Sequence, residues 1–83
     1  MHEAEQLIAE WRSVASQEAF SSASRVQARL FDLYGEVRDL PAGRLVETWL
    51  TLTVQRDLFS GAELLELLDE LEVLLRQPVS TAH

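Results

Sequence analysis

Cysteine is absent from the 83 residues, and glycine and proline are scarce, with three and two residues. Without cysteine the chain can form no disulfide, offers no thiolate nucleophile and has no sulfur ligand for zinc. Three scattered glycines exclude a loop that would cradle a phosphate. No apolar run approaches the roughly 18–20 residues that span a bilayer, and the first residues lack the basic start of a secretory signal. We therefore expect a cytoplasmic protein without a membrane partner.

The two histidines, His2 and His83, lie at opposite ends of the chain. Hydrolytic and nucleophilic catalysis usually requires a base such as histidine beside an activated nucleophile. A stable metal site requires three or four ligands on a fixed scaffold. Two terminal histidines supply neither arrangement. We therefore expect no catalytic residue, no metal and no cofactor, and we predict that the protein is not an enzyme.

Lysine is also absent, and seven arginines face fourteen acidic residues, so the net charge is −7. The excess is concentrated toward the two ends, because residues 1–20 carry −3 and residues 60–83 carry −4. Such a balance repels the phosphates of nucleic acids and anionic lipids. It excludes direct nucleic-acid binding and favours a basic protein as the partner. Arginine as the sole basic residue besides histidine is typical of a GC-rich bacterial genome.

Apolar residues recur every three to four positions in residues 4–15 and 26–37, which predicts two amphipathic helices. The serine-rich segment at residues 21–24 lies between them and favours a helix cap. We expect a break there, with Ser22 or Ser24 starting the second helix. One continuous helix through this segment is the alternative.

Pro41 is placed to open a third helix, because proline is favoured at the first helical position and disfavours helix in the residue before it. The stretch that follows, residues 44–59, is ambiguous. Its apolar residues keep helical spacing, but residues 50–54 alternate as a strand would. We favour a helix, because a single strand would have no pairing partner within the chain and would need a dimer to satisfy its backbone groups.

The clearest local signal is the S-x-x-E capping box of Ser60 and Glu63, in which each side chain accepts a hydrogen bond from the backbone of the other residue. A fourth helix is therefore expected from Gly61 to about Gln77. Pro78 would end it, because proline cannot continue a regular helix.

Together these patterns predict an all-α protein, a small three- to four-helix up-and-down bundle. Residues 1–78 would form a single helical domain and residues 79–83 a flexible tail. The sequence shows no obvious internal repeat. The residues expected at the centre of the bundle are one from each helix: Trp11, Leu30, Trp49 and Leu68.

The fourth predicted helix carries seven leucines over an arc of about 180°, wider than the ~100° stripe that packs on one core. Two interpretations remain open. Either the helix is central and contacts two neighbours of its own bundle, or one flank, formed by Leu67, Leu71 and Leu74, is an association surface. In the second case a homodimer through this flank would bury the spare leucines.

We therefore expect a small acidic, non-enzymatic protein-binding module, such as a regulator, an inhibitor, an immunity-type protein or an accessory protein. Its apolar centre would be the leucine flank, and carboxylates around it would steer a basic partner. The alternatives are a nucleic-acid mimic that inhibits a DNA-binding protein, or a small accessory subunit of a multicomponent enzyme. The predicted protein-binding residues are Leu67, Leu71, Leu74, Glu66, Asp69, Glu70 and Glu72.

Overall fold

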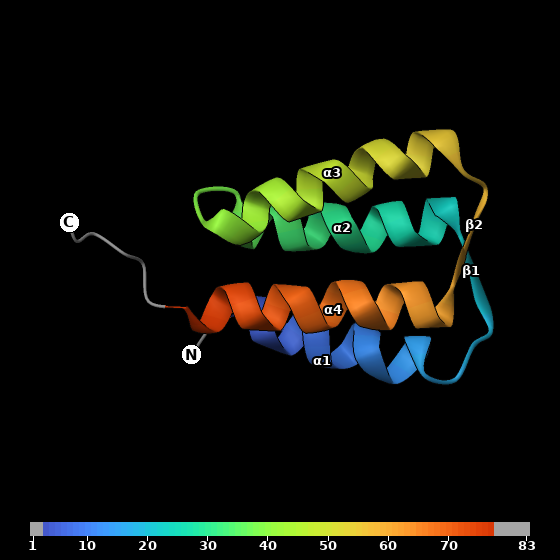
Figure 1. Ribbon diagram of the computed structural model, residues 1–83, viewed down its shortest axis with the longest axis horizontal. Coiled ribbons are helices and arrows are strands. Elements are labelled where there is room, and N and C mark those ends of the chain that lie inside the picture. Colours follow the sequence, from blue (N-terminus) through green and yellow to red (C-terminus); the bar gives the residue numbers. More distant parts are fainter. Residues whose placement is uncertain (1–2, 78–83) are drawn as a thin grey trace.

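Four helices and two three-residue strands make up the computed structural model, which describes residues 3–77 (Figure 1). The helices run alternately up and down, so the predicted all-α up-and-down bundle is confirmed. The predicted stop at Pro78 and the predicted tail at residues 79–83 lie outside the described residues. The elements are α1 (Glu3–Ala15), β1 (Phe20–Ser22), α2 (Ala23–Val37), α3 (Pro41–Gln55), β2 (Leu58–Ser60) and α4 (Gly61–Arg76).

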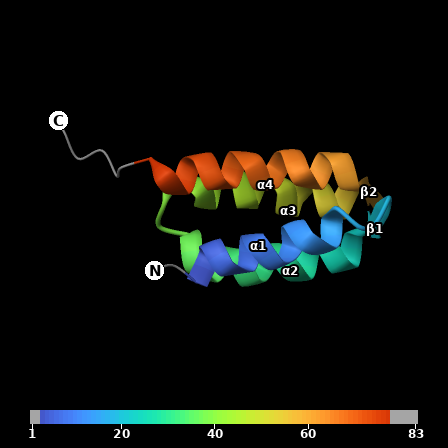
Figure 2. The same ribbon diagram turned by 90° about the horizontal axis from the view of Figure 1, so that it is seen from below.

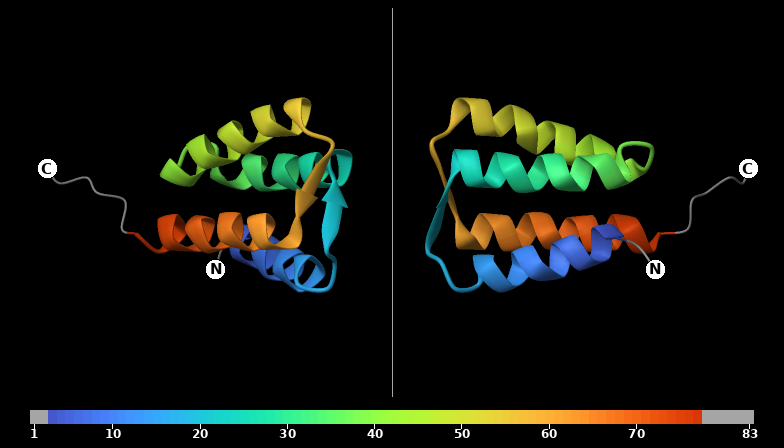
Figure 3. Two further views of the ribbon diagram at one scale, coloured as in Figure 1. Left: turned by 45° about the vertical axis from the view of Figure 1, so that its right-hand side comes forward. Right: turned by 180° about the vertical axis from the view of Figure 1, so that it is seen from behind.

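The helices form two layers of two. Helices α1 and α4 lie in the lower layer of Figure 1, and α2 and α3 lie in the upper one. Figure 2, turned by 90°, shows α4 in front of α3 and α1 in front of α2, so the two views together give a two-by-two arrangement of the helices. Each helix contacts its two neighbours in this arrangement: α1 with α2, α2 with α3, α3 with α4, and α4 with α1. The chain passes between the layers through the two strands, which cross side by side at one end of the bundle (Figure 3).

The chain consists of two helix–strand–helix units, α1–β1–α2 and α3–β2–α4. Each element of the second unit begins 38 residues after its counterpart in the first, so residue 41 corresponds to residue 3 and residue 61 to residue 23. Our prediction that the chain has no internal repeat is therefore wrong. It failed because few side chains are identical between the units, Trp11 and Trp49 or Leu30 and Leu68 among them, and many of the other pairs differ even in polarity.

The register of the two strands relates the two units by a two-fold axis. Ser21 pairs with Phe59, its own counterpart, and the flanking pairs are Phe20 with Ser60 and Ser22 with Leu58. Successive side chains of a strand point to opposite faces. Ser21 and Phe59 are buried against the core, whereas Phe20 and Leu58 are exposed on the outer face. A pseudo-two-fold axis therefore passes between the two central residues of the ribbon.

The two ion pairs beside the ribbon repeat the symmetry with the charges exchanged. Glu18 pairs with Arg25 at 3.4 Å in the first unit, and their counterparts Arg56 and Glu63 pair at 2.7 Å in the second. Each pair joins the loop before a strand to the first turn of the helix after it. The same contact is thus made in both units with opposite polarity.

The predicted starts of α2, α3 and α4 are confirmed, but the predicted end of the third helix is wrong: the helix favoured over residues 44–59 ends at Gln55, and Leu58–Ser60 form β2. Ser22 caps α2, which rules out one continuous helix through residues 21–24, and Pro41 occupies the first turn of α3. Helix α3 includes residues 50–54, so the strand alternative for that segment is excluded. The strands that do exist were not predicted, because three residues are too few to show an alternating pattern.

Three of the four predicted central residues, Trp11, Leu30 and Leu68, are buried. Trp49 is only half-buried and lies at the edge of the core, where its ring centroid is 5.7 Å from that of Phe59. The two units differ at the centre of the strand: the unit of Trp11 carries Ser21 there, whereas the unit of Trp49 carries the larger, fully buried Phe59.

The two helix caps offer a matched test of the capping box. Ser60 accepts a hydrogen bond from the Glu63 amide at 3.1 Å, and the Ser60 amide donates to the Glu63 carboxylate at 3.0 Å. The hydroxyl of its counterpart Ser22 accepts a longer bond of 3.4 Å from the amide of Arg25, whose side chain cannot accept a return bond. We expect Ser60→Ala to lower the free energy of unfolding by about 1 kcal/mol. Ser22→Ala should cost measurably less in the same urea titration, and equal costs would contradict this account.

Candidate protein-binding surface

The predicted leucine flank of α4 does not lie on the surface. Leu67 and Leu71 are fully buried in the core, so the prediction that they form an exposed association surface is wrong. Helix α4 contacts both α1 and α3. Two neighbours on adjacent sides cover a wider arc than one, which accounts for the wide spread of leucines. The first of the two interpretations, a central helix within its own bundle, is confirmed for these residues.

Leu74 is half-buried and belongs to a shallow apolar hollow near the C-terminal end of α4. The hollow has a volume of about 260 Å³ and is lined by Leu74, Val73, Asp69 and Glu70. Val73 is 53% exposed and supplies apolar surface that the sequence did not reveal. The sequence pattern marked Leu74 because it belongs to the leucine stripe, but it gave no reason to single out Val73 on the solvent side.

The four carboxylates predicted to bind a partner divide into two groups. Arg12 of α1 donates to Asp69 and to Glu72, both at 2.8 Å, so these two acids have a cationic partner within the fold. Glu66 and Glu70 are exposed and make no ion pair among residues 3–77. Arg12 lies almost sixty positions away in the sequence, so only the packing of α1 on α4 reveals the distinction.

Charge is segregated between the two layers of the bundle. Helices α1 and α4 carry eight acidic residues and two arginines, a net charge of −6. Helices α2 and α3 carry three acidic residues and three arginines, a net charge of zero. A basic partner would therefore be attracted to the α1–α4 layer in preference to the opposite side.

The pKa of one carboxyl is strongly shifted, but the cause is structural. Arg56 donates two hydrogen bonds to Glu63, at 2.7 and 2.9 Å, and the Ser60 amide donates a third. These bonds favour the charged form and lower the Glu63 pKa from its usual 4.5 to about 2. The Arg56 guanidinium also lies 4.4 Å from the centre of the Phe59 ring. The cluster anchors the start of α4 and leaves Glu63 no proton to exchange near neutral pH.

This shift predicts how stability depends on pH. Because the folded pKa of Glu63 lies below its unfolded value, the stabilisation is complete above about pH 4.5 and is lost as the pH falls toward 2. Glu63→Gln keeps a capping-box side chain but removes the charge. We expect the variant to be less stable than the wild type at pH 7 and equally stable near pH 2, as measured by urea unfolding. A difference that is the same at both pH values would contradict this assignment.

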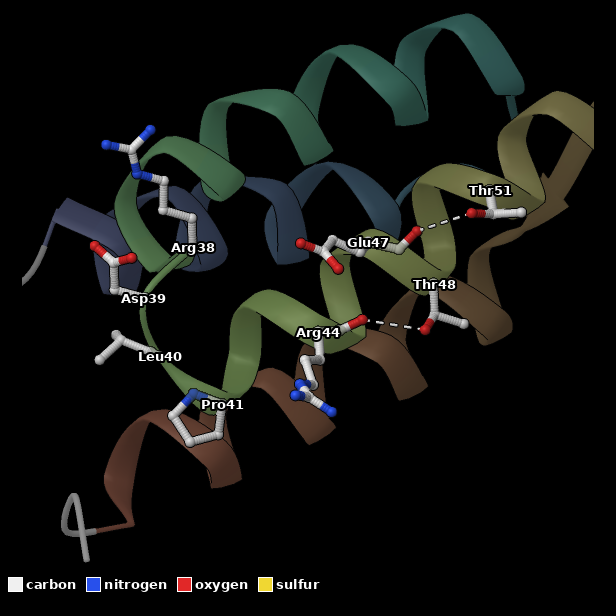
Figure 4. A pocket seen from close by; sticks show the side chains of 8 residues that line it. All are labelled: Arg38, Asp39, Leu40, Pro41, Arg44, Glu47, Thr48 and Thr51. Carbon is white, nitrogen blue, oxygen red and sulfur yellow. Dashed lines mark hydrogen bonds between the residues drawn. The ribbon is translucent and has the colours of Figure 1, made fainter. Parts of the chain in front are cut away.

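A second hollow lies at the turn between α2 and α3 and is open and polar (Figure 4). Its two threonine hydroxyls donate to the backbone oxygens of Arg44 and Glu47 one turn earlier. Figure 4 shows the guanidinium groups of Arg38 and Arg44 pointing in different directions. The polar groups therefore do not converge on one position where a small molecule could bind. The lining residues are Arg38, Asp39, Leu40, Pro41, Arg44, Glu47, Thr48 and Thr51.

Apolar side chains remain at the surface elsewhere too. Within residues 3–77, five large ones are more than half exposed, and they lie on the ribbon, on α2, on α3 and on α4. Single exposed apolar residues are normal on proteins, so only those with a structural context are informative. The five are Phe20, Phe31, Val54, Leu58 and Val73.

The described part of the chain contains no group of three His, Asp or Glu side chains positioned to hold a metal ion. It also contains no helix with the length and apolar character needed to cross a membrane. In comparisons with protein-family models, curated proteins and solved structures, the chain finds no match. The chemistry of the surface is therefore the basis for assigning a function.

Proposed function

We propose that the protein is a non-enzymatic protein-binding module whose acidic α1–α4 layer binds a basic segment of another protein. The site is the apolar hollow of Val73 and Leu74 together with the exposed carboxylates of Glu66 and Glu70. The observation that carries the proposal is the separation of charge, −6 on this layer and zero on the other. The hollow supplies the apolar contact that a purely electrostatic surface would lack.

The two kinds of group have different roles. Carboxylates with no arginine partner attract a basic segment over several ångströms and raise its association rate, an effect that salt screens. Val73 and Leu74 line the hollow together with Asp69 and Glu70 and would be covered once the segment is bound. Burial of apolar surface at the centre of a polar rim is the usual arrangement of a protein interface.

The proposal is tested by capture of partners from extracts of the source cells with immobilised wild type and two double variants. Glu66→Gln/Glu70→Gln removes the two unpaired carboxylates of the site. The control, Asp39→Asn/Asp57→Asn, changes the charge equally at two exposed turn residues outside the layer. We expect one stoichiometric protein with a basic segment to be retained by the wild type and the control and to be lost from the site variant.

Other outcomes contradict the proposal. No retained protein, or equal loss from both double variants, would mean that the α4 carboxylates are not a specific site. Release of the partner by duplex DNA would instead favour the nucleic-acid mimic, in which the acidic layer occupies a DNA-binding surface. A partner that is a catalytic subunit, with activity dependent on this chain, would identify the protein as an accessory subunit.

A further inference from the structure

The outward face of α2 carries an exposed phenyl ring. Phe31 is 58% exposed, although it belongs to a helix whose other large apolar residues face the core. Its counterpart in the second unit is Asp69, which pairs with Arg12. The same position therefore carries an ion-paired carboxylate in one layer and an unpartnered aromatic ring in the other.

Gly35 lies one turn beyond Phe31, and the packing of the chain on itself does not explain it. The other two glycines have clear reasons: a Cβ on Gly43 would lie 2.6 Å from the backbone oxygen of Val37, and one on Gly61 would lie 2.6 Å from that of Glu18. A Cβ on Gly35 would meet nothing within 4 Å. Glycine inside a helix costs about 1 kcal/mol relative to alanine. Close approach of another backbone would account for that cost.

The charged residues of α2 are arranged so that two antiparallel copies of the helix would place opposite charges side by side. Along one side the helix presents Arg25 and Arg29, followed by Asp32 and Glu36. If a second α2 runs antiparallel and the two helices cross midway between Leu30 and Phe31, each arginine lies opposite an acidic residue. Two copies of α2 crossing antiparallel would therefore set Arg25 opposite Glu36 of the second copy and Arg29 opposite Asp32.

The same crossing brings the phenyl rings together. Around the helix, at about 100° per residue, Ala28, Phe31 and Gly35 fall within roughly 60° of one another, and all three are exposed. An antiparallel two-fold crossing brings the same flank of each helix into contact. Phe31 would pack beside Phe31 of the second copy, and the absence of a Cβ at Gly35 lets the two backbones approach.

Net charge favours the α2–α3 layer as the contact between two copies of the chain. Two α1–α4 layers brought face to face would oppose −6 with −6, whereas the α2–α3 layer carries no net charge. We propose that two copies of the chain associate across a two-fold axis through the outer face of α2. The association uses a different surface from the proposed partner site and does not depend on it. One helix crossing buries an area at the low end of specific interfaces, so we expect dissociation in the micromolar range.

The test is sedimentation equilibrium of the full chain from micromolar to millimolar concentration. We expect a monomer–dimer equilibrium for the wild type and for the control Leu58→Asp, which alters an equally exposed apolar residue on β2. Phe31→Asp should be monomeric throughout, with the circular dichroism of the wild type. Arg29→Asp should weaken the dimer at least tenfold by facing Asp32 of the second copy, and Arg29→Asp/Asp32→Arg should restore it.

Three results would overturn the proposal. One is a wild type that stays monomeric at millimolar concentration. Another is a dimer that survives Phe31→Asp. The third is a charge exchange that fails to restore association while both variants remain helical. None of these measurements involves the captured partner, so failure here leaves the proposed function standing.

Discussion

Leu71→Asp is expected to unfold the protein. Leu71 is buried at the centre of the core, on the face of α4 that packs within the bundle. A carboxylate at this position would be desolvated without a partner, which costs about 4–5 kcal/mol or more. An 83-residue domain has a total stability toward the lower end of the ~5–15 kcal/mol usual for native proteins, so the loss consumes most of it. Circular dichroism at 25 °C should show the loss of helix.

Leu74→Asp is the matched control, because it makes the same change one turn later at a half-buried position on the hollow of α4. This variant should remain folded, since the new carboxylate can reach water. A folded Leu71→Asp protein would show that Leu71 is on the surface. In that case the leucine flank of α4 would be the exposed surface that the sequence pattern predicted.

Phe59→Ala should have the next largest effect, a loss of about 3–5 kcal/mol in the free energy of unfolding. The ring is completely buried beneath the strand ribbon, and it contacts Trp49 on one side and the Arg56 guanidinium on another. Loss of the phenyl ring would leave a cavity and would remove the contacts with Trp49 and Arg56. Urea unfolding followed by tryptophan fluorescence measures the loss. Leu58→Ala changes the adjacent exposed residue of β2 and should cost less than about 1 kcal/mol, whereas similar costs at the two positions would contradict the assigned faces of the ribbon.

The helices could be predicted because their signals are local. A proline at the first turn, a serine cap and a capping box each act within four residues, so Pro41, Ser22 and Ser60 fixed three helix starts. The strand ribbon could not be predicted, because its two strands are 38 residues apart and three residues long. The repeat was hidden for a related reason: the units conserve which positions are buried rather than which side chains occupy them.

The candidate site was predicted only in part, because a single helix pattern does not show how many neighbours the helix has. With two neighbours, α4 buries Leu67 and Leu71 and leaves Leu74 at the edge. The carboxylates Glu66, Asp69 and Glu70 are exposed, as the helix pattern predicts, but their division into paired and unpaired groups depends on Arg12, which only the tertiary fold brings close. Val73 lacked any signal in the sequence for the same reason.

The two proposed surfaces have a combined consequence. A dimer through α2 would turn the neutral layers of the two copies toward each other and direct both acidic layers outward. Two identical sites on one particle can engage a partner with repeated basic segments, or a partner that is itself dimeric, with an avidity beyond either single contact. The dimer would thus strengthen binding without adding a new contact to the site.

Carboxyl footprinting of the captured complex would show whether the acidic α1–α4 layer is the surface that the partner covers. Carbodiimide-mediated labelling, read by mass spectrometry, reports the accessibility of each acidic side chain with and without the partner. We predict that Glu66 and Glu70 are labelled in the free protein and protected in the complex, while Asp39 and Asp57 are labelled equally in both. Unchanged labelling of Glu66 and Glu70 in a complex that protects other carboxylates would contradict the assignment of the acidic α1–α4 layer as the partner-binding surface.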